Sequence, residues 1–342
     1  MKRILSIDGG GIRGIVPGQI LLNLEKKIQK ATSNSNARLA DYFDFFSGTS
    51  TGGILTCIYL YPDNANPDKP KFSAQQAVDL YTQFGHNIFE IPFWKRLESM
   101  GGLRDEKFPA EQIEALLEKY FGNKHISDLI KPCLITSYDI EERCAKFLTQ
   151  HDARLHGDPY NFLIKDVARA TSAAPTYFEP ALIKSKTGVS YPLVDGGMFA
   201  NDPTLCAYSE LRGSEGNPTA KEMFILSLGT GSTKNPYKYD DMKTKGLVGW
   251  AQPVIDIMMA GSSETTSYHL KNMFKAEQAS DNYVRIVPKD LKHASEAMDN
   301  VSPENIAALV ELGQYTAEIN NDQLDRVVKT IINQPADPVI FK

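Results

Sequence analysis

The sequence predicts an α/β fold, because two stretches have the pattern of a strand, a glycine turn and a helix. In the first, a short run rich in isoleucine, residues 3–7, ends at a glycine loop, residues 8–14, and apolar residues then recur at helical spacing. In the second, Phe45 and Phe46 lead into a Gly-x-Ser-x-Gly turn that is followed by the apolar residues 54–60. Both units are typical of a sheet whose strands alternate with helices.

The first glycine loop has two interpretations. Gly9, Gly11 and Gly14 satisfy Gly-x-Gly-x-x-Gly, which on its own is typical of a dinucleotide site. However, an aspartate directly before the loop is unfavourable beside a pyrophosphate, and no strand ending in a ribose-binding acid follows the helix. Consecutive glycines also expose backbone N–H groups with no Cβ in the way. We therefore interpret the loop as an oxyanion hole with Gly10 and Gly11 as donors, and assign Gly14 to packing of the helix on the strand.

The Gly-x-Ser-x-Gly stretch predicts a nucleophile elbow with Ser50 at its tip. Gly48 and Gly52 flank the serine, and a side chain at either position would collide with the adjoining strand or helix. A turn of small residues without any chemistry would have the same local pattern. Whether this stretch is a nucleophile elbow or only a turn depends on which motifs occur elsewhere in the chain.

Residues 61–121 carry no motif with a defined chemistry. Residues 62–70 have the composition of a surface loop, and we expect helices over residues 73–84 and 109–121. Between them lies an aromatic segment that is broken by proline. Residues 88–103 have two equally good interpretations: a lid over the elbow or a wall of an acyl-chain channel, and ordinary aromatic packing at the edge of the core.

The third informative stretch is Asp195 with Gly196 and Gly197. Short strands are expected at residues 132–138 and 145–149, and Asp195 stands at the end of a further strand. Strand ends are where α/β sheets present catalytic groups, although an aspartate here could equally cap a turn.

The remaining C-terminal part is expected to be mainly helical, with strands near residues 225–228 and 283–287. No linker or change in composition separates a second domain. We therefore expect one domain over residues 1–342, in which residues 4–208 carry the motifs and residues 209–342 complete the same fold.

Composition excludes several classes of function. The net charge of the 342 residues is -5, which provides no field to attract nucleic acid, so any contact with lipid would have to be local and largely apolar. No apolar run approaches the roughly 20 residues that a transmembrane helix needs. The N-terminus reaches an aspartate before a secretory core could form, which predicts a cytoplasmic protein. The four cysteines match no metal-binding spacing, and no metal or cofactor is expected.

Three motifs taken together resemble the patatin-like phospholipase family in content and in order. They are Asp-Gly-Gly-Gly-Ile-Arg-Gly at residues 8–14, Gly-Thr-Ser-Thr-Gly at 48–52 and Asp-Gly-Gly at 195–197. Each is unspecific alone, but the set is specific. Further stretches similar to patatin extend the resemblance over most of the chain: residues 172–178, 201–204, 226–231 and 255–259.

The resemblance implies a three-layer α/β/α fold with a mostly parallel central sheet, and a lipid acyl hydrolase with a Ser-Asp dyad. Ser50 is then the nucleophile, Asp195 the base, and the loop from Gly9 to Arg13 the oxyanion hole. The implied partner is a lipid substrate at a membrane or micelle surface. The chain departs from the family pattern at Asp202, where the resemblance predicts a second asparagine.

Two other functions remain open from the sequence. An α/β-hydrolase triad has the order Ser, Asp, His, and both His269 and His293 follow Asp195. Neither histidine lies in a glycine-rich or strand-end context, so we predict that both are surface or structural residues. The second alternative is a nucleotide-binding or acyl-carrier-binding module, in which the glycine loops hold phosphates and Ser50 is only a ligand.

Overall fold

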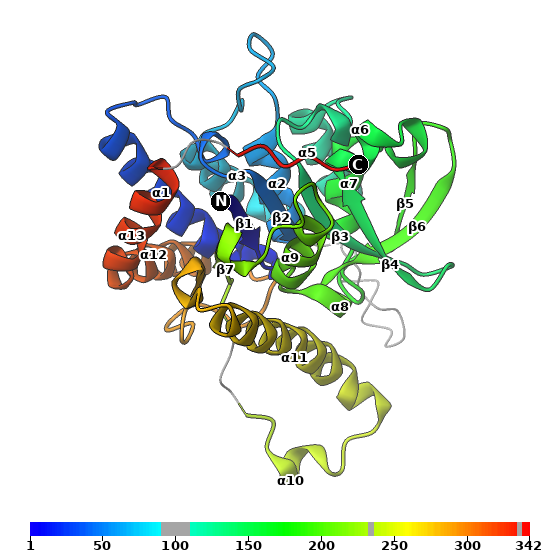
Figure 1. The fold of residues 1–342 in the computed structure, drawn as a ribbon. Coiled ribbons are helices and arrows are strands. Elements are labelled where there is room, and N and C mark those ends of the chain that lie inside the picture. Colours follow the sequence, from blue (N-terminus) through cyan, green and yellow to red (C-terminus); the bar gives the residue numbers. More distant parts are fainter. Residues whose placement is uncertain (90–109, 232–235, 334–336) are drawn as a thin grey trace.

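A computed structural model describes residues 1–89, 110–231, 236–333 and 337–342 of the chain (Figure 1). Its centre is a mixed sheet with the strand order β5-β6-β3-β2-β1-β7-β8, and β4 pairs with β3. β1, β2, β3, β7 and β8 pair in parallel, whereas β4, β5 and β6 pair antiparallel. The strands are β1 (Lys2–Ile7), β2 (Phe45–Thr49), β3 (Cys133–Asp139), β4 (Cys144–Thr149), β5 (Ala181–Lys184), β6 (Ser190–Asp195), β7 (Met223–Leu228) and β8 (Tyr283–Ile286).

Helices cover both faces of the sheet. Successive residues of a strand point to opposite faces, and the core divides accordingly. Leu5 and Leu226 pack in the cluster that includes the helices after the glycine turns, whereas Ile4 and Ile225 pack against the opposite helices. The described helices are α1 (Ile15–Thr32), α2 (Thr51–Leu60), α3 (Ala74–Phe89), α5 (Ala110–Phe121), α6 (Gln150–Leu155), α7 (Ile164–Thr171), α8 (Gly197–Ala200), α9 (Thr204–Arg212), α10 (Tyr239–Met242), α11 (Leu247–Ala276), α12 (Pro303–Ile319) and α13 (Asn321–Ile332).

This arrangement confirms the predicted α/β/α architecture with a mostly parallel sheet. The two strand–turn–helix units are β1 with α1 and β2 with α2, and their strands are neighbours in the sheet. No described helix has the length and apolarity of a membrane span. Whether residues 88–103 form a lid stays open, because their side chains lie outside the described part of the chain.

β3 determines how the ends of β2 and β6 are placed relative to each other. Its first half pairs in parallel with β2, where Thr49 is opposite Thr136. Its second half pairs antiparallel with β6, where Asp195 is opposite Ser137. The last residues of β2 and β6 are therefore opposite adjacent positions of one strand, which brings the elbow and Asp195 together although 145 residues separate Ser50 from Asp195 (195 - 50).

Candidate active site

Ser50 lies on a sharp turn between β2 and α2, in a backbone conformation that non-glycine residues rarely adopt. Its φ is 54° and its ψ is -122°. A Cβ on Gly48 would lie 2.2 Å from the carbonyl oxygen of Gly52, and a Cβ on Gly52 would lie 2.1 Å from that of Ile7. Both glycines are therefore required by close packing of the turn against neighbouring backbone, as a nucleophile elbow demands.

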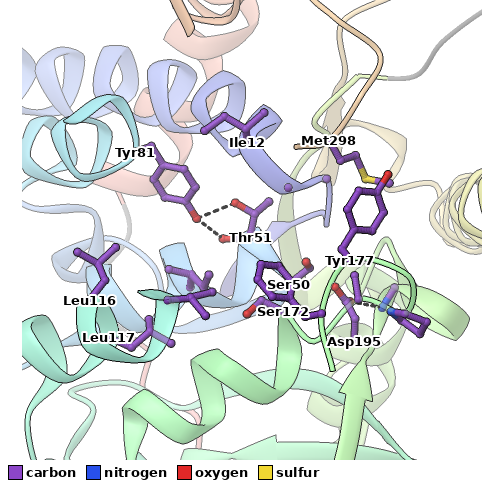
Figure 2. Close-up of a pocket in the computed structure, with 18 of the residues that line it drawn as sticks. Ile12, Ser50, Thr51, Tyr81, Leu116, Leu117, Ser172, Tyr177, Asp195 and Met298 are labelled. Atoms are coloured by element: carbon purple, nitrogen blue, oxygen red, sulfur yellow. Dashed lines mark hydrogen bonds between the residues drawn. The ribbon is translucent and has the colours of Figure 1, made fainter. Parts of the chain in front are cut away.

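Hydrogen bonds from three other elements hold the elbow in place. The Ser50 amide donates to the Thr171 hydroxyl at 2.8 Å, and that hydroxyl donates to the Thr136 carbonyl of β3 at 2.7 Å. Figure 2 shows Tyr81 of α3 bonded to Thr51, with its hydroxyl 2.6 Å from the side-chain oxygen and 3.0 Å from the carbonyl oxygen. These contacts fix the first turn of α2. Thr171 was not singled out from the sequence, because its partners are remote in the chain.

Asp195 ends β6 as predicted and is only 5% exposed. Its Oδ1 accepts a 2.7 Å hydrogen bond from the Gly197 amide, and the Gly196 backbone packs against Thr136. Burial raises the pKa of Asp195 to about 6, while interactions with the Ser50 hydroxyl and the Gly197 amide lower it in part. A carboxylate at its ordinary pKa near 3.9 is a weak base for a hydroxyl. Burial thus makes this carboxylate a stronger base.

The glycine loop after β1 leaves two amides available. The Gly9 amide donates to the Asn201 carbonyl at 3.0 Å, so Gly9 joins the loop to the segment after Asp195. Within the described part of the chain, the amides of Gly10 and Gly11 donate to no partner. Both glycines line the pocket beside Ser50, at the start of a helical turn that continues into α1. Helix N-termini favour negative charge. Arg13 is buried and supports the loop, because its amide donates to the Gly10 carbonyl.

The loop is also constrained from outside. Gly11 has a φ of 59°, and a Cβ there would lie 2.2 Å from the carbonyl oxygen of Met298, which accepts the Ile12 amide. Gly14 packs against Thr51 at the start of α2, where a Cβ would lie 2.1 Å from the hydroxyl oxygen. The expectation that Gly14 packs on a strand was therefore wrong. Its neighbour is a helix because β1 and β2 are adjacent and parallel.

A buried ion cluster lies directly behind the loop. Arg285 of β8 donates to both carboxylate oxygens of Asp8, at 2.7 and 2.5 Å, and its Nη1 lies 3.1 Å from Asp202 Oδ2. Burial lowers the pKa of Arg285, but Asp202 and Asp8 raise it above its ordinary value. Asp202, where the chain departs from the family pattern, therefore has Arg285 as its ionic partner. No sequence pattern pointed to Arg285, which lies 277 residues from Asp8.

Ser50 and Asp195 line one apolar pocket. Figure 2 shows Leu116 and Leu117 on the opposite side of Ser50 from Asp195 and Tyr177. None of the described residues that line the pocket is lysine, arginine or histidine. The end away from Asp195 is formed by aliphatic side chains of α2, α3 and α5: Ile54, Ile58, Leu80, Ile113, Leu116 and Leu117.

The two histidines of the alternative triad lie elsewhere. His269 is exposed on α11 and His293 is exposed on the loop after β8. Among the described residues, therefore, the pocket combines a serine, a carboxylate and two amides without an imidazole.

The chain is similar to known proteins over most of its length. The model of the patatin-like phospholipase family matches residues 5–208, which contain Ser50, Asp195 and the glycine loop. Patatin-like protein 2 of Oryza sativa subsp. indica is 32% identical and covers 95% of this chain and 86% of its own. Patatin group D-2 of Solanum tuberosum is 33% identical over 92% of this chain and 83% of its own.

Two further similarities complete the comparison. The protein named probable inactive patatin-3-Kuras 1 of Solanum tuberosum is 31% identical and covers 92% of this chain and 86% of its own. The structure of human GIVD cytosolic phospholipase A2 aligns with a TM-score of 0.49 at 11% identity, over 97% of this chain and 60% of that one. From the family model and the plant relatives, the chain belongs to the patatin-like phospholipase family.

Proposed function

We propose that this protein hydrolyses carboxylic ester bonds of acyl lipids through a dyad of Ser50 and Asp195. One observation carries the proposal. The ends of β2 and β6 are opposite adjacent residues of β3, so a strained serine and a buried carboxylate share one apolar pocket. The family is one of lipid acyl hydrolases, which agrees with this chemistry.

The reaction follows from the groups at the site. Asp195 accepts the Ser50 proton as Oγ attacks the ester carbonyl carbon, and a tetrahedral oxyanion forms. Asp195 then returns the proton to the leaving alcohol, and an acyl-serine remains. Water attacks that ester by the same route, with Asp195 as base, and releases the fatty acid. A single carboxylate with a pKa of about 6 performs both transfers.

Gly10 and Gly11 stabilise the oxyanion in this scheme. Their amides donate to no described partner and lie at the start of a helical turn, where developing negative charge is favoured. The loss of one such donor typically costs about 2.7 to 4 kcal/mol in the transition state. The oxyanion hole therefore provides a large share of the catalysis.

The pocket indicates the class of substrate. Its aliphatic end, between α2, α3 and α5, is suited to an acyl chain, whereas phosphates would meet no basic side chain among the described lining residues. This argues against a nucleotide-binding module. We propose an activity of the phospholipase A or lysophospholipase type.

A panel of acyl lipids, assayed with wild type and Ser50→Ala, tests the proposal. We expect wild type to release fatty acid, identified by mass, from phospholipids or lysophospholipids, and the variant to release none above background. Thr49→Ser, a neighbouring change outside the dyad, is the control for handling and purity. One relative is named probable inactive, so membership of the family does not replace this experiment. Equal release by wild type and Ser50→Ala would contradict the proposal.

A further inference from the structure

The segment that contains α10 and the first half of α11 exposes an unusual number of apolar side chains. Leu247 and Val248 are 94% and 93% exposed, and Tyr239 is 79% exposed. Figure 1 shows α10 and its adjoining loop extending away from the rest of the molecule. Clusters of this kind mark interaction sites. We call residues 237–258 the α10–α11 surface; its other exposed apolar side chains are Tyr237, Trp250, Val254, Ile257 and Met258.

The first half of α11 is apolar on both of its faces. Ile255 and Met259 are one turn apart and line the pocket that contains Ser50. Ile257 and Met258, between them, are exposed. Exposed apolar side chains that gather on one surface are typical of contact with another molecule or with lipid. The inner side of this helix packs against the protein, and its outer side is exposed to solvent.

α11 is attached directly to the catalytic turn. It packs on α8, which begins two residues after Asp195. The Asn201 side-chain amide donates to the Ser263 hydroxyl of α11 at 3.3 Å. The helix that exposes Ile257 and Met258 therefore also forms part of the pocket wall, through Ile255 and Met259.

The charges on this surface indicate what it contacts. Lysines and aspartates balance there, and Lys243 pairs with Asp240 while Asp256 accepts a hydrogen bond from the Tyr237 hydroxyl. The whole chain has a net charge of -5, so nothing attracts a polyanion. An apolar, balanced surface fits the boundary between head groups and acyl chains of a lipid layer. The charged residues are Lys238, Lys243, Lys245, Asp240, Asp241 and Asp256.

From these observations we propose that the α10–α11 surface docks on a lipid layer, so that an acyl lipid moves beneath α11 into the pocket without crossing water. The use of this route rests on the proposed function. The docking itself does not need turnover, so a catalytically inert variant can test it. Since the surface is apolar and balanced in charge, binding should depend little on anionic lipid or on salt.

The first experiment measures flotation of the full chain, as Ser50→Ala, with phosphatidylcholine vesicles. We expect binding that persists at high salt, and a loss of at least about tenfold when Leu247→Asp and Val248→Asp are added. The matched control is Leu182→Asp with Val189→Asp. It also replaces one exposed leucine and one exposed valine, but at the β5–β6 hairpin. This control should bind like the parent.

Any of three outcomes of these measurements would overturn the docking proposal. The first is equal flotation of the Leu247→Asp/Val248→Asp protein and its parent, and the second is an equal loss of binding in the Leu182→Asp/Val189→Asp control. The third is a concentration-dependent dimer, detected by light scattering, that the Leu247→Asp/Val248→Asp change dissociates while the parent fails to float. That result would assign the surface to a second copy of the chain.

A second readout needs no change in the surface itself. The chain has two tryptophans, and Trp94→Phe leaves only Trp250 to report. Its emission should shift to the blue on addition of vesicles and be quenched by brominated acyl chains. Unchanged emission at saturating lipid would contradict docking.

With Ser50 restored, turnover of vesicle lipid by the Leu247→Asp/Val248→Asp protein should fall at least about tenfold more than its turnover of p-nitrophenyl butyrate. If wild type cleaves neither substrate, the proposed function fails while the flotation result still decides docking.

Discussion

Two strands of the sheet end at the same tripeptide, Asp-Gly-Gly, and the two aspartates differ in what they contact. Asp8 follows β1 and is held by both terminal nitrogens of Arg285. Asp195 ends β6, receives one amide hydrogen bond and shares the pocket with Ser50. The tripeptide therefore marks a strand end whose glycines pack closely against neighbouring residues, and the two carboxylates differ in their partners. Arg285 holds Asp8 in the buried ion cluster, whereas no cation among the described residues contacts Asp195, which is the base in the proposed reaction.

The largest effect should come from removing the free carboxylate. Asp195→Asn preserves shape and an oxygen for the Gly197 amide but cannot accept the Ser50 proton, so we expect kcat to fall about 10⁴-fold. Turnover of p-nitrophenyl butyrate, with circular dichroism as a check of folding, measures it. Asp158→Asn, at an exposed aspartate, should keep full turnover. If folded Asp195→Asn protein had a kcat within tenfold of wild type, Asp195 would not be the base.

The loop after Asp8 should contribute through its amides. Gly11→Ala places a Cβ 2.2 Å from the Met298 carbonyl oxygen and has to displace the loop. We expect a loss of about 10²- to 10³-fold in kcat. Gly122→Ala is the matched control, because Gly122 also has a positive φ but nothing lies within 4 Å of the added Cβ. Equal turnover in the two variants would show that the Gly11 amide has no part in catalysis.

Changing the partner of Asp8 should affect stability. Arg285→Met leaves Asp8 and Asp202 buried without their cation, which typically costs about 3 to 5 kcal/mol of unfolding free energy. Urea denaturation measures the loss. Arg326→Met, at an exposed arginine, should change the unfolding free energy by less than about 0.5 kcal/mol. A wild-type unfolding midpoint for Arg285→Met would show that the cluster is not an anchor.

A smaller effect is expected from pH. Burial raises the pKa of Asp195 to about 6, and only the ionised form accepts a proton. kcat/KM should therefore be level above pH 6 and fall about tenfold for each unit below it. The profile is measured with a soluble ester in wild type and in the His269→Ala/His293→Ala variant. If kcat/KM fell only near pH 4, or if the pH of its fall changed in the histidine variant, the titrating group would not be Asp195.

The sequence predicted the parts of this site that are local. Each strand, glycine turn and helix is adjacent in the chain, so Ser50, the glycine loop and Asp195 could be recognised from short patterns. The sequence did not predict how these parts meet, because the register of β3 with β2 and β6 depends on pairing between distant segments. For the same reason Arg285 and Met298 were missed, and Gly14 was assigned the wrong neighbour. β5 also went unnoticed, since four residues at a sheet edge give little periodicity.

The central claim is that Ser50 is activated by Asp195 without a histidine. A fluorophosphonate probe, followed by peptide mapping by mass, tests it most directly. We predict covalent label on Ser50 in wild type and a labelling rate within about twofold of wild type in the His269→Ala/His293→Ala protein. In Asp195→Asn the rate should fall at least about 10²-fold. Loss of labelling in the histidine variant, or undiminished labelling of Asp195→Asn, would contradict the dyad.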